Sequence, residues 1–210
     1  MSKRTITRRT AVASAATAIV ALPLAAFSRP SALAYAFSGP AADRSLGLTA
    51  PLACTRATPR KTEGPYYSPQ TPARANLREP DTRGQPLVLH GLVLTPDCQP
   101  VAGAVVDIWH SDENGRYDNS GFRYRGHQFT DSAGAFRFET IRPARYRRRT
   151  SHIHVKVQGA STRLLTSQLF FPDRPVENAR DGIFREDLLL SLSRNPEGWL
   201  GRFDFVLSPA

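Results

Sequence analysis

The chain has 210 residues, of which 40% are hydrophobic and 22% are charged, and its formal net charge is +10. Five of these positive charges lie within residues 1–36, where no acidic residue balances them, so residues 37–210 carry a net charge of only about +5. Apart from a short basic run at residues 145–149, the other Lys and Arg residues are dispersed, which argues against nucleic acid as a partner.

Residues 1–36 have the pattern of an export signal. A basic leader precedes a mostly apolar stretch at residues 11–27, and residues 34–36 (Ala-Tyr-Ala) offer a small-x-small cleavage site. The pair Arg8-Arg9 resembles a twin-arginine signal, which exports folded proteins; the alternatives are an ordinary secretory signal and an uncleaved anchor. No later stretch is long and apolar enough to span a bilayer. We therefore expect a periplasmic or extracellular protein that is not inserted in the membrane once the signal is removed.

Residues 37–86 are rich in Pro, Gly, Ala and Thr and have no sustained helical period, so they are predicted to form an extended N-terminal arm. Within this arm, residues 62–67 (Thr-Glu-Gly-Pro-Tyr-Tyr) are too distinctive for a simple linker. The arm also contains Cys54, and the only other cysteine is Cys98. In an oxidising compartment these two are predicted to form a disulfide that stabilises the fold by a few kcal/mol. The alternative is a pair of free thiols.

From residue 87 onward the sequence differs from the arm, because it contains segments with the pattern of β-strands. Residues 87–210 are predicted to form one all-β domain, an antiparallel β-sandwich with a prealbumin-like core. Its expected strands are short, β-branched or alternating, and bounded by turns such as residues 113–115 and 131–134. The only expected helix is a turn or two at residues 176–184. The predicted strands are residues 87–95, 104–109, 135–140, 152–157, 163–171 and 202–207.

His152 and His154 lie on one predicted strand, so both imidazoles project from the same face and can reach a single metal ion. Tyr146 precedes them at close range, and Tyr117 follows a tight turn at the end of another strand. Two phenolates with two neutral imidazoles suit ferric iron better than zinc. Tyr124, seven residues after Tyr117, is a competing candidate on position alone.

Five motifs follow one another along the chain: residues 62–67, residues 107–117 (from Asp-Ile-Trp-His to Gly-Arg-Tyr), Tyr146, residues 149–154 (Arg-Thr-Ser-His-Ile-His) and residues 168–171 (Gln-Leu-Phe-Phe). Together they resemble the intradiol ring-cleavage dioxygenases over about residues 60–172. The resemblance implies non-haem Fe(III) held by Tyr117, Tyr146, His152 and His154, with Tyr146 released when substrate binds.

The resemblance further implies that a catechol-type substrate and O2 react to give a cis,cis-muconate-type diacid. Arg149 matches an arginine that stabilises negative charge on the substrate ring, and Gln168 matches a polar residue beside the substrate and oxygen pocket. Tyr66 is expected to contact substrate or to close the cavity. Only Arg147 and Arg148 separate Tyr146 from Arg149, a shorter loop than in protocatechuate dioxygenases, so the pocket is expected to be open and cationic on that side.

Two other function classes are weighed against this interpretation. The strand pair around residues 91–109 is also typical of prealbumin-like sandwich modules that bind ligands without catalysis. A zinc hydrolase built on the histidine pair is disfavoured, because no carboxylate or third histidine completes a familiar zinc site. The helical dimerisation region of catechol and hydroxyquinol dioxygenases has no counterpart here, while a homo-oligomer formed through the sandwich or the arm is compatible with the sequence.

Overall fold

The computed structural model of the protein describes Cys54 and residues 56–210. The predicted export signal at residues 1–36 and the arm up to residue 53 lie outside the described residues. Across the described part of the chain, no helix is long and apolar enough to cross a membrane.

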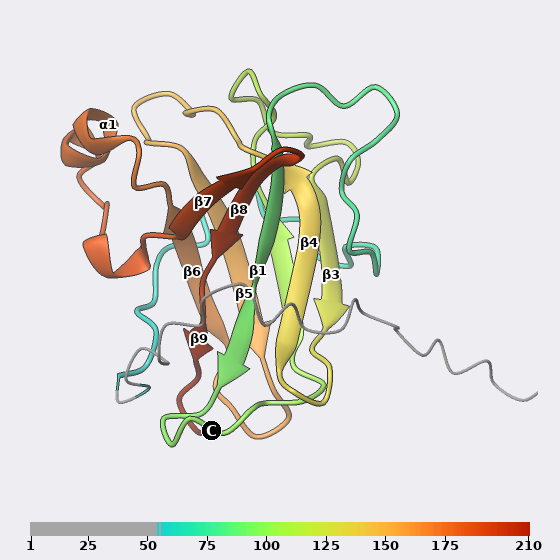
Figure 1. Cartoon of the computed structure of the whole chain (residues 1–210), viewed down its shortest axis with the longest axis vertical. Helices are drawn as coiled ribbons and strands as arrows, with labels where there is room; N and C mark the ends of the chain where they lie inside the picture. Colours follow the sequence, from blue (N-terminus) through green and yellow to red (C-terminus); the bar gives the residue numbers. More distant parts are fainter. Residues whose placement is uncertain (1–53, 55) are drawn as a thin grey trace, which may run out of the picture. The chain divides into compact units, whose positions relative to one another are not determined.

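The described residues form two packed β-sheets, so the predicted β-sandwich is confirmed (Figure 1). Two short helical segments, α1 (Pro175–Arg180) and the 3-10 turn η1 (Glu186–Leu188), follow the second sheet. The first sheet contains β1 (Pro86–Leu94), β4 (Ala135–Ile141), β7 (Ser191–Asn195), β8 (Gly198–Arg202) and β9 (Phe205–Val206), in the order β4-β1-β8-β7 with β9 paired to β1. The second contains β2 (Val105–Trp109), β3 (Arg125–Phe129), β5 (His152–Gln158) and β6 (Leu165–Phe170), in the order β3-β2-β5-β6.

The core lies between the two sheets and takes alternate residues from each strand. On β5, Ile153, Val155 and Val157 are completely buried in the main apolar cluster. Because neighbouring side chains on a strand point to opposite faces, His152 and His154 project from the outer face of the second sheet.

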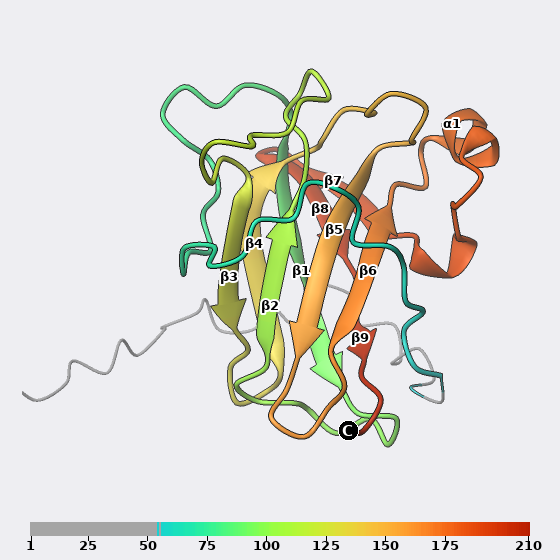
Figure 2. The same cartoon turned by 180° about the vertical axis from the view of Figure 1, so that it is seen from behind.

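The N-terminal arm covers this outer face. Figure 2 shows the segment around residues 56–75 crossing the second sheet, and backbone hydrogen bonds fix its course. The Lys61 amide donates to the Thr166 carbonyl at 2.8 Å, and the Arg74 amide donates to the His127 carbonyl at 2.9 Å. The arm therefore covers the face from which both histidines project.

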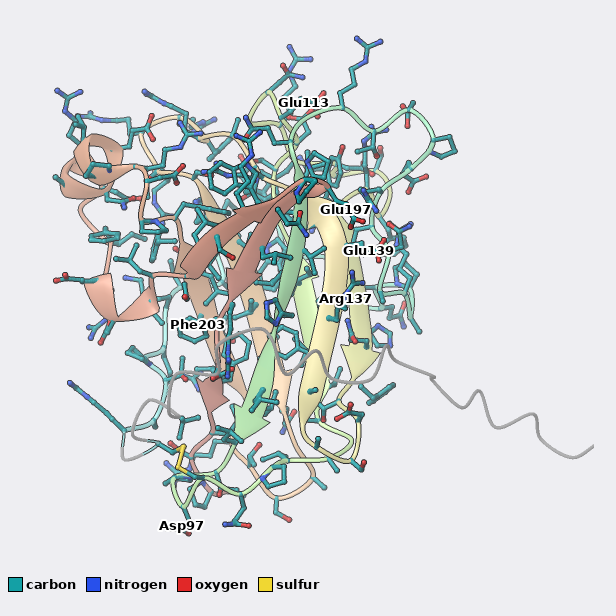
Figure 3. The ribbon with its side chains drawn as sticks, viewed as in Figure 1. Asp97, Glu113, Arg137, Glu139, Glu197 and Phe203 are labelled. Atoms are coloured by element: carbon teal, nitrogen blue, oxygen red, sulfur yellow. A yellow bond between two sulfur atoms is a disulfide. The ribbon has the colours of Figure 1, made fainter. Side chains whose placement is uncertain are left out.

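The outer face of the first sheet, by contrast, carries solvent-exposed ion pairs. On β4, Arg137 lies beside Glu139, and its Nη1 donates to Glu139 Oε1 at 2.6 Å (Figure 3). Surface pairs of this kind contribute little stability, about 0–1 kcal/mol each. The two sheets thus differ: one faces solvent and the other faces the arm.

Cys54 and Cys98 are joined by a disulfide with a Cα–Cα distance of 5.3 Å. The Cys54 side chain is buried in a small cluster with Leu94 and Val206. Beside it, the Thr58 amide donates to the Val206 carbonyl at 2.9 Å. The disulfide thus fastens the start of the described arm to the loop that follows β1.

Five of the six predicted strands are confirmed as β1, β2, β4, β5 and β6, and α1 overlaps the predicted helical region at residues 176–184. The predictions missed β3, β7 and most of β8. The β3 sequence, Arg-Gly-His-Gln-Phe, has no alternation of apolar residues, so sequence alone did not predict a strand there. Its pairing within the sheet and its buried arginine make it a strand. In addition, β1 pairs with β8 and β9 in parallel, so the first sheet is not purely antiparallel.

The predicted strand at residues 202–207 is interrupted, because β8 ends at Arg202 and β9 begins at Phe205. At the break, the Phe203 amide donates to the His90 carbonyl at 3.0 Å, and Asp204 Oδ1 accepts from the Leu92 amide at 3.0 Å. Figure 3 shows Phe203 at this position between the two strands. A Cβ on Gly91 would lie 1.8 Å from the Phe203 carbonyl oxygen, so only glycine permits this approach.

Candidate active site

The Nε2 atoms of His152 and His154, which could bind a metal, lie close together. The two atoms lie 3.1 Å apart, and the two residues are only 4% and 3% exposed. The His152 Nδ1 atom lies 2.6 Å from the Thr150 carbonyl oxygen, which can only accept. We therefore assign the His152 proton to Nδ1, which leaves the Nε2 lone pair facing the site.

Burial keeps both imidazoles neutral. Desolvation, assisted by the positive charge of Arg149, lowers the pKa of His152 to about 4. Desolvation and the neighbouring His152 hold the pKa of His154 well below its usual range. Neutral imidazole is the form that binds metal, so both side chains are ready to act as ligands at neutral pH.

Trp109, at the end of β2, orients the second histidine. Its ring stacks on His154 with centroids 4.8 Å apart and planes 9° apart. The two residues face each other across the β2–β5 pairing. The arm backbone also closes in on this ring at Gly64, where a Cβ would lie 3.3 Å from His154 Cε1. The His154 ring is thus in contact with a tryptophan and close to a glycine turn.

Tyr117 is delivered by the loop between β2 and β3. Asp112 starts the turn in this loop, and its Oδ1 accepts from the amides of Asn114 and Arg116 at 2.8 Å each. Gly115 has φ 78° and packs against the backbone of the loop between β4 and β5. These contacts bring the Tyr117 hydroxyl to 3.4 Å from His152 Nε2. Burial raises the pKa of Tyr117, so its phenol ionises only when a cation binds the oxygen.

Tyr146 lies in the loop between β4 and β5. Its carbonyl accepts from the Arg149 amide at 2.9 Å, which closes a tight turn in which Arg147 has φ 53°. The Tyr146 ring packs edge-on against the Tyr117 ring with centroids 5.5 Å apart. Tyr146 itself is partly buried, and exposed arginines, Arg145 and Arg147, lie on both sides of it in the chain.

Tyr66 reaches the same place from the arm. Its ring stacks on Tyr117 with centroids 4.6 Å apart, and its hydroxyl is hydrogen-bonded to the Tyr146 hydroxyl. That hydrogen bond, together with desolvation, raises the pKa of Tyr66. Tyr66 therefore contacts both predicted tyrosine ligands.

Arg149 and Gln168 form one polar unit beside the histidines. Arg149 Nη2 donates to Gln168 Oε1 at 2.6 Å, and Gln168 Nε2 donates to the Thr62 carbonyl at 2.8 Å. Gln168 on β6 is directly paired with His154 on β5. The structure thus brings together all seven residues predicted for metal binding, catalysis or substrate contact. The competing candidate Tyr124 is buried elsewhere, stacked on His110.

The donor atoms fit a metal ion that accepts both imidazole and phenol oxygen. Metal–nitrogen bonds of about 2.0–2.1 Å at right angles place two nitrogens about 3 Å apart, close to the observed 3.1 Å between the Nε2 atoms. The described residues contain no cluster of three or more His, Cys, Asp or Glu side chains that could hold a metal. The oxygen donor nearest to the two histidines is the Tyr117 hydroxyl, 3.4 Å from His152 Nε2. This donor chemistry favours ferric iron and disfavours zinc.

Sequence reasoning missed several residues and contacts that shape the site. The stacking of the buried Trp109 on His154 is one such contact. Asp181 was not considered, although it binds Arg149. Arg125 is 1% exposed, and its Nη1 donates to the Tyr66 carbonyl. None of these residues belongs to a local pattern that signals its partner, because each contact depends on how separate loops pack.

Comparisons with known proteins indicate the family and the fold. A family model described as Dioxygenase matches residues 62–209. The chain is 32% identical to catechol 1,2-dioxygenase 1 of Acinetobacter lwoffii, over 57% of this chain and 48% of the relative. It is also 32% identical to a chlorocatechol 1,2-dioxygenase of Pseudomonas sp. (strain P51), over 56% of this chain and 57% of the relative. The chain thus spans about half the length of the curated relatives it matches.

Two solved structures share the fold. One is the dioxygenase domain of a dioxygenase and carbohydrate-binding protein fusion from Streptomyces sp. SirexAA-E, with a TM-score of 0.71 and 43% identity over 74% of this chain and 100% of that one. The other is 3-chlorocatechol 1,2-dioxygenase from Rhodococcus opacus 1CP, with a TM-score of 0.69 and 25% identity over 74% of each chain.

Proposed function

Because the chain belongs to the intradiol ring-cleavage dioxygenase family, we propose that it opens a catechol ring between the two hydroxylated carbons with dioxygen. The product is a cis,cis-muconate-type diacid. One observation carries the proposal: two neutral imidazoles and two tyrosine hydroxyls converge beside a fixed arginine. A module that only binds ligands has no need of this donor set.

The metal we propose is non-haem ferric iron, held by Tyr117, Tyr146, His152 and His154. When bound, it supplies the Lewis acidity that lowers the pKa values of the catechol hydroxyls and the redox chemistry that lets the ring react with dioxygen. The His152 bond to the Thr150 carbonyl and the His154 stack on Trp109 hold both rings in orientation for this role.

Tyr146 is the ligand that we propose to dissociate when substrate binds. Its hydroxyl is hydrogen-bonded to Tyr66 of the arm, whereas the Tyr117 hydroxyl lies 3.4 Å from His152 Nε2. The freed Tyr146 phenolate accepts a proton from the incoming catechol at its hydroxyl oxygen. Tyr66 holds that same oxygen by a hydrogen bond, so it stabilises the tyrosine in its protonated, released position.

Arg149 provides a fixed positive charge beside the site. We propose that its guanidinium stabilises the negative charge that develops on the ring during cleavage, an effect that is large where water is excluded. Gln168 Oε1 accepts a hydrogen bond from the Arg149 guanidinium and thereby limits the movement of Arg149. The arm closes over the site at Gly64, beside His154, and at Thr62, whose carbonyl accepts from Gln168.

We propose that the protein works outside the cytoplasm. The export signal predicted at residues 1–36 motivates this, and the disulfide between Cys54 and Cys98 supports it, because such bonds persist in oxidising compartments. A folded protein with iron already bound is the cargo that the twin-arginine route accepts.

Iron loading and oxygen uptake test the proposed function. We expect the purified, ferric-loaded protein to be red-brown from tyrosinate-to-iron charge transfer and to consume oxygen when a catechol is added. A colourless protein that takes up no oxygen after ferric loading would overturn the proposal. Thermal unfolding of the same sample shows whether the protein was folded during the assay.

The Tyr66 hydroxyl is expected to contribute to turnover. Tyr66→Phe removes the hydrogen bond to Tyr146 but keeps the stacked ring, and a neutral hydrogen bond is worth about 0.5–1.5 kcal/mol, so kcat should fall about three- to tenfold. Tyr67→Phe is the matched control, because the Tyr67 hydroxyl bonds Asp107 at 3.2 Å and does not touch the tyrosine group. Equal kcat values for Tyr66→Phe and the unmodified enzyme would contradict this role.

The rim of the site favours an anionic catechol. The Arg147 guanidinium lies 5.3 Å from the centre of the Tyr146 ring, and Arg145 Nη2 donates to the Arg147 carbonyl at 3.1 Å. Among the described residues, neither of these arginines, nor Arg148, forms a salt bridge. We therefore propose that the substrate carries an acidic group, such as a ring carboxylate, that faces this loop.

Salt and charge removal test this substrate class. Arg147→Gln should lower kcat/KM about two- to fivefold for a carboxylate-bearing catechol and leave plain catechol unaffected, as expected for an exposed charge. Raising the salt concentration should have the same selective effect. Arg163→Gln removes an exposed charge just before β6, at the opposite end of that strand from Gln168 and Phe170, and serves as the control. Identical changes for both substrates would refute the preference.

A further inference from the structure

Asp181 is a buried acid that immediately follows α1. Its side chain is only 1% exposed, although it belongs to a surface segment that lies outside all the sequence motifs of the site. Burying a carboxylate is costly unless charged or polar partners compensate for the lost hydration. The partners of Asp181 therefore indicate what it does.

Two of these partners belong to the segment that leads into β5. Asp181 Oδ2 accepts from Arg149 Nε at 2.8 Å and from the Thr150 amide at 3.0 Å. The other carboxylate oxygen, Oδ1, accepts from the Ile183 amide at 3.1 Å. The carboxylate is therefore fully engaged, and its strongest partner is the guanidinium beside the metal-ligand candidates.

The contact fixes the orientation of the guanidinium as well as pairing its charge. The Arg149 group is a rigid planar fork, and it is held at Nε by Asp181 and at Nη2 by Gln168. Because these two hydrogen bonds start from different nitrogens of the guanidinium, they fix its plane and the direction in which Nη1 points. Gln168 alone would leave the fork free to rotate about a single bond.

The α1 segment is itself docked onto the sandwich. Asn178, in α1, accepts from the Thr150 hydroxyl at 2.7 Å and donates from Nδ2 to the Phe171 carbonyl at 2.9 Å. Asn178 is 5% exposed. Two side chains from one short segment, Asn178 and Asp181, thus hold the backbone and side chain of residues 149–150.

We propose that Asp181 is a positioning residue that holds Arg149 in its working orientation, so that the C-terminal end of α1 helps to orient the arginine. The inference rests on the proposed function of Arg149. It explains why a charged group that is expensive to bury lies behind the site, pointing at the arginine and not at solvent.

Asp181→Asn and Asp173→Asn form a matched pair of variants. Asp173 precedes α1 and accepts from Arg142 Nη2 at 2.7 and 2.8 Å, and the Arg142 side chain is only 6% exposed, so this variant also removes a charge from a partly buried ion pair. Arg142 packs on Phe171 and Trp199, away from the tyrosines and histidines. We expect Asp181→Asn to lower kcat about 10- to 100-fold, the usual effect of losing a supporting contact, and Asp173→Asn to leave kcat unchanged.

Three further readouts separate positioning from loss of fold. The affinity for catechol, titrated without oxygen through the iron absorption band, should change by less than about threefold in Asp181→Asn, because Arg149 acts on charge that develops later. In the Arg149→Met background, Asp181→Asn should cause no further loss of kcat. Asp181→Glu, which retains the carboxylate, should recover part of the kcat.

The inference is overturned if Asp181→Asn has the same kcat as the unmodified enzyme. It is likewise overturned if the double variant Asp181→Asn/Arg149→Met has a much lower kcat than Arg149→Met alone. It is also overturned if Asp173→Asn loses kcat to the same extent. Failure of the proposed function would look different, because the unmodified protein would then show no oxygen uptake with any catechol.

Discussion

His152→Gln is expected to lose ferric iron binding and catechol cleavage together, with kcat/KM reduced by more than about 100-fold. Contacts that merely support a metal ligand cost about 10- to 100-fold when removed, so loss of the ligand itself costs more. The His152 Nε2 atom lies 3.1 Å from that of His154 and 3.4 Å from the Tyr117 hydroxyl, so it borders both neighbouring donors. Metal analysis of the purified variant and its visible absorption measure the effect.

His127→Gln is the control for this variant. His127 lies on β3 of the same sheet and bonds Thr71 at 3.1 Å, outside the tyrosine and histidine group. It should bind iron and turn over as the unmodified enzyme does. An iron content in His152→Gln equal to that of the control would contradict the proposed ligand set.

Arg149→Met is expected to retain iron and colour but to lose about 10²- to 10³-fold in kcat, the usual loss when one preorganised donor to developing charge is removed. The methionine keeps much of the apolar stem while removing the charge and both fixed hydrogen bonds, to Asp181 and to Gln168. Steady-state kinetics measured well below the unfolding temperature provide the comparison.

Arg149→Lys separates charge from geometry. Lysine keeps the positive charge but cannot bond Asp181 and Gln168 at once with a planar fork, so we expect a kcat between those of Arg149→Met and the unmodified enzyme. If Arg149→Met raises KM alone and leaves kcat intact, Arg149 binds substrate but does not stabilise charge during cleavage.

The histidine pair illustrates what sequence can predict. The alternation of a strand is local, so His-x-His placed both imidazoles on one face before any partner was known. The same reasoning gave β1, β2, β4, β5 and β6 and the sandwich they form. The gathering of Tyr66, Tyr117 and Tyr146 was inferred from the resemblance to a family, since these tyrosines lie on separate loops and no local spacing brings them together.

Asp181 illustrates what sequence could not predict. It lies 32 residues after Arg149, and the predicted helical turn at residues 176–184 gave no sign that its end would meet the start of β5. In the structure α1 ends at Arg180, and Asp181 adopts an extended backbone that directs its carboxylate inward. Contacts of this kind depend on how a loop packs, which no periodicity encodes.

The arm was also underestimated. It was predicted as an extended segment separate from the domain at residues 87–210, and that division remains a prediction. In the structure the segment around residues 56–75 crosses the second sheet (Figure 2) and contributes Gly64, Thr62 and Tyr66 to the site. The family match begins at residue 62, within this arm.

Product analysis after reaction under ¹⁸O2 tests the central claim most directly. The ferric-loaded protein and a carboxylate-bearing catechol should yield a ring-opened diacid, cleaved between the two hydroxylated carbons, whose mass shows that both oxygen atoms of O2 contribute to the product. A semialdehyde, formed by cleavage beside the hydroxylated carbons, would contradict the intradiol assignment and with it the roles given to Tyr146 and Arg149.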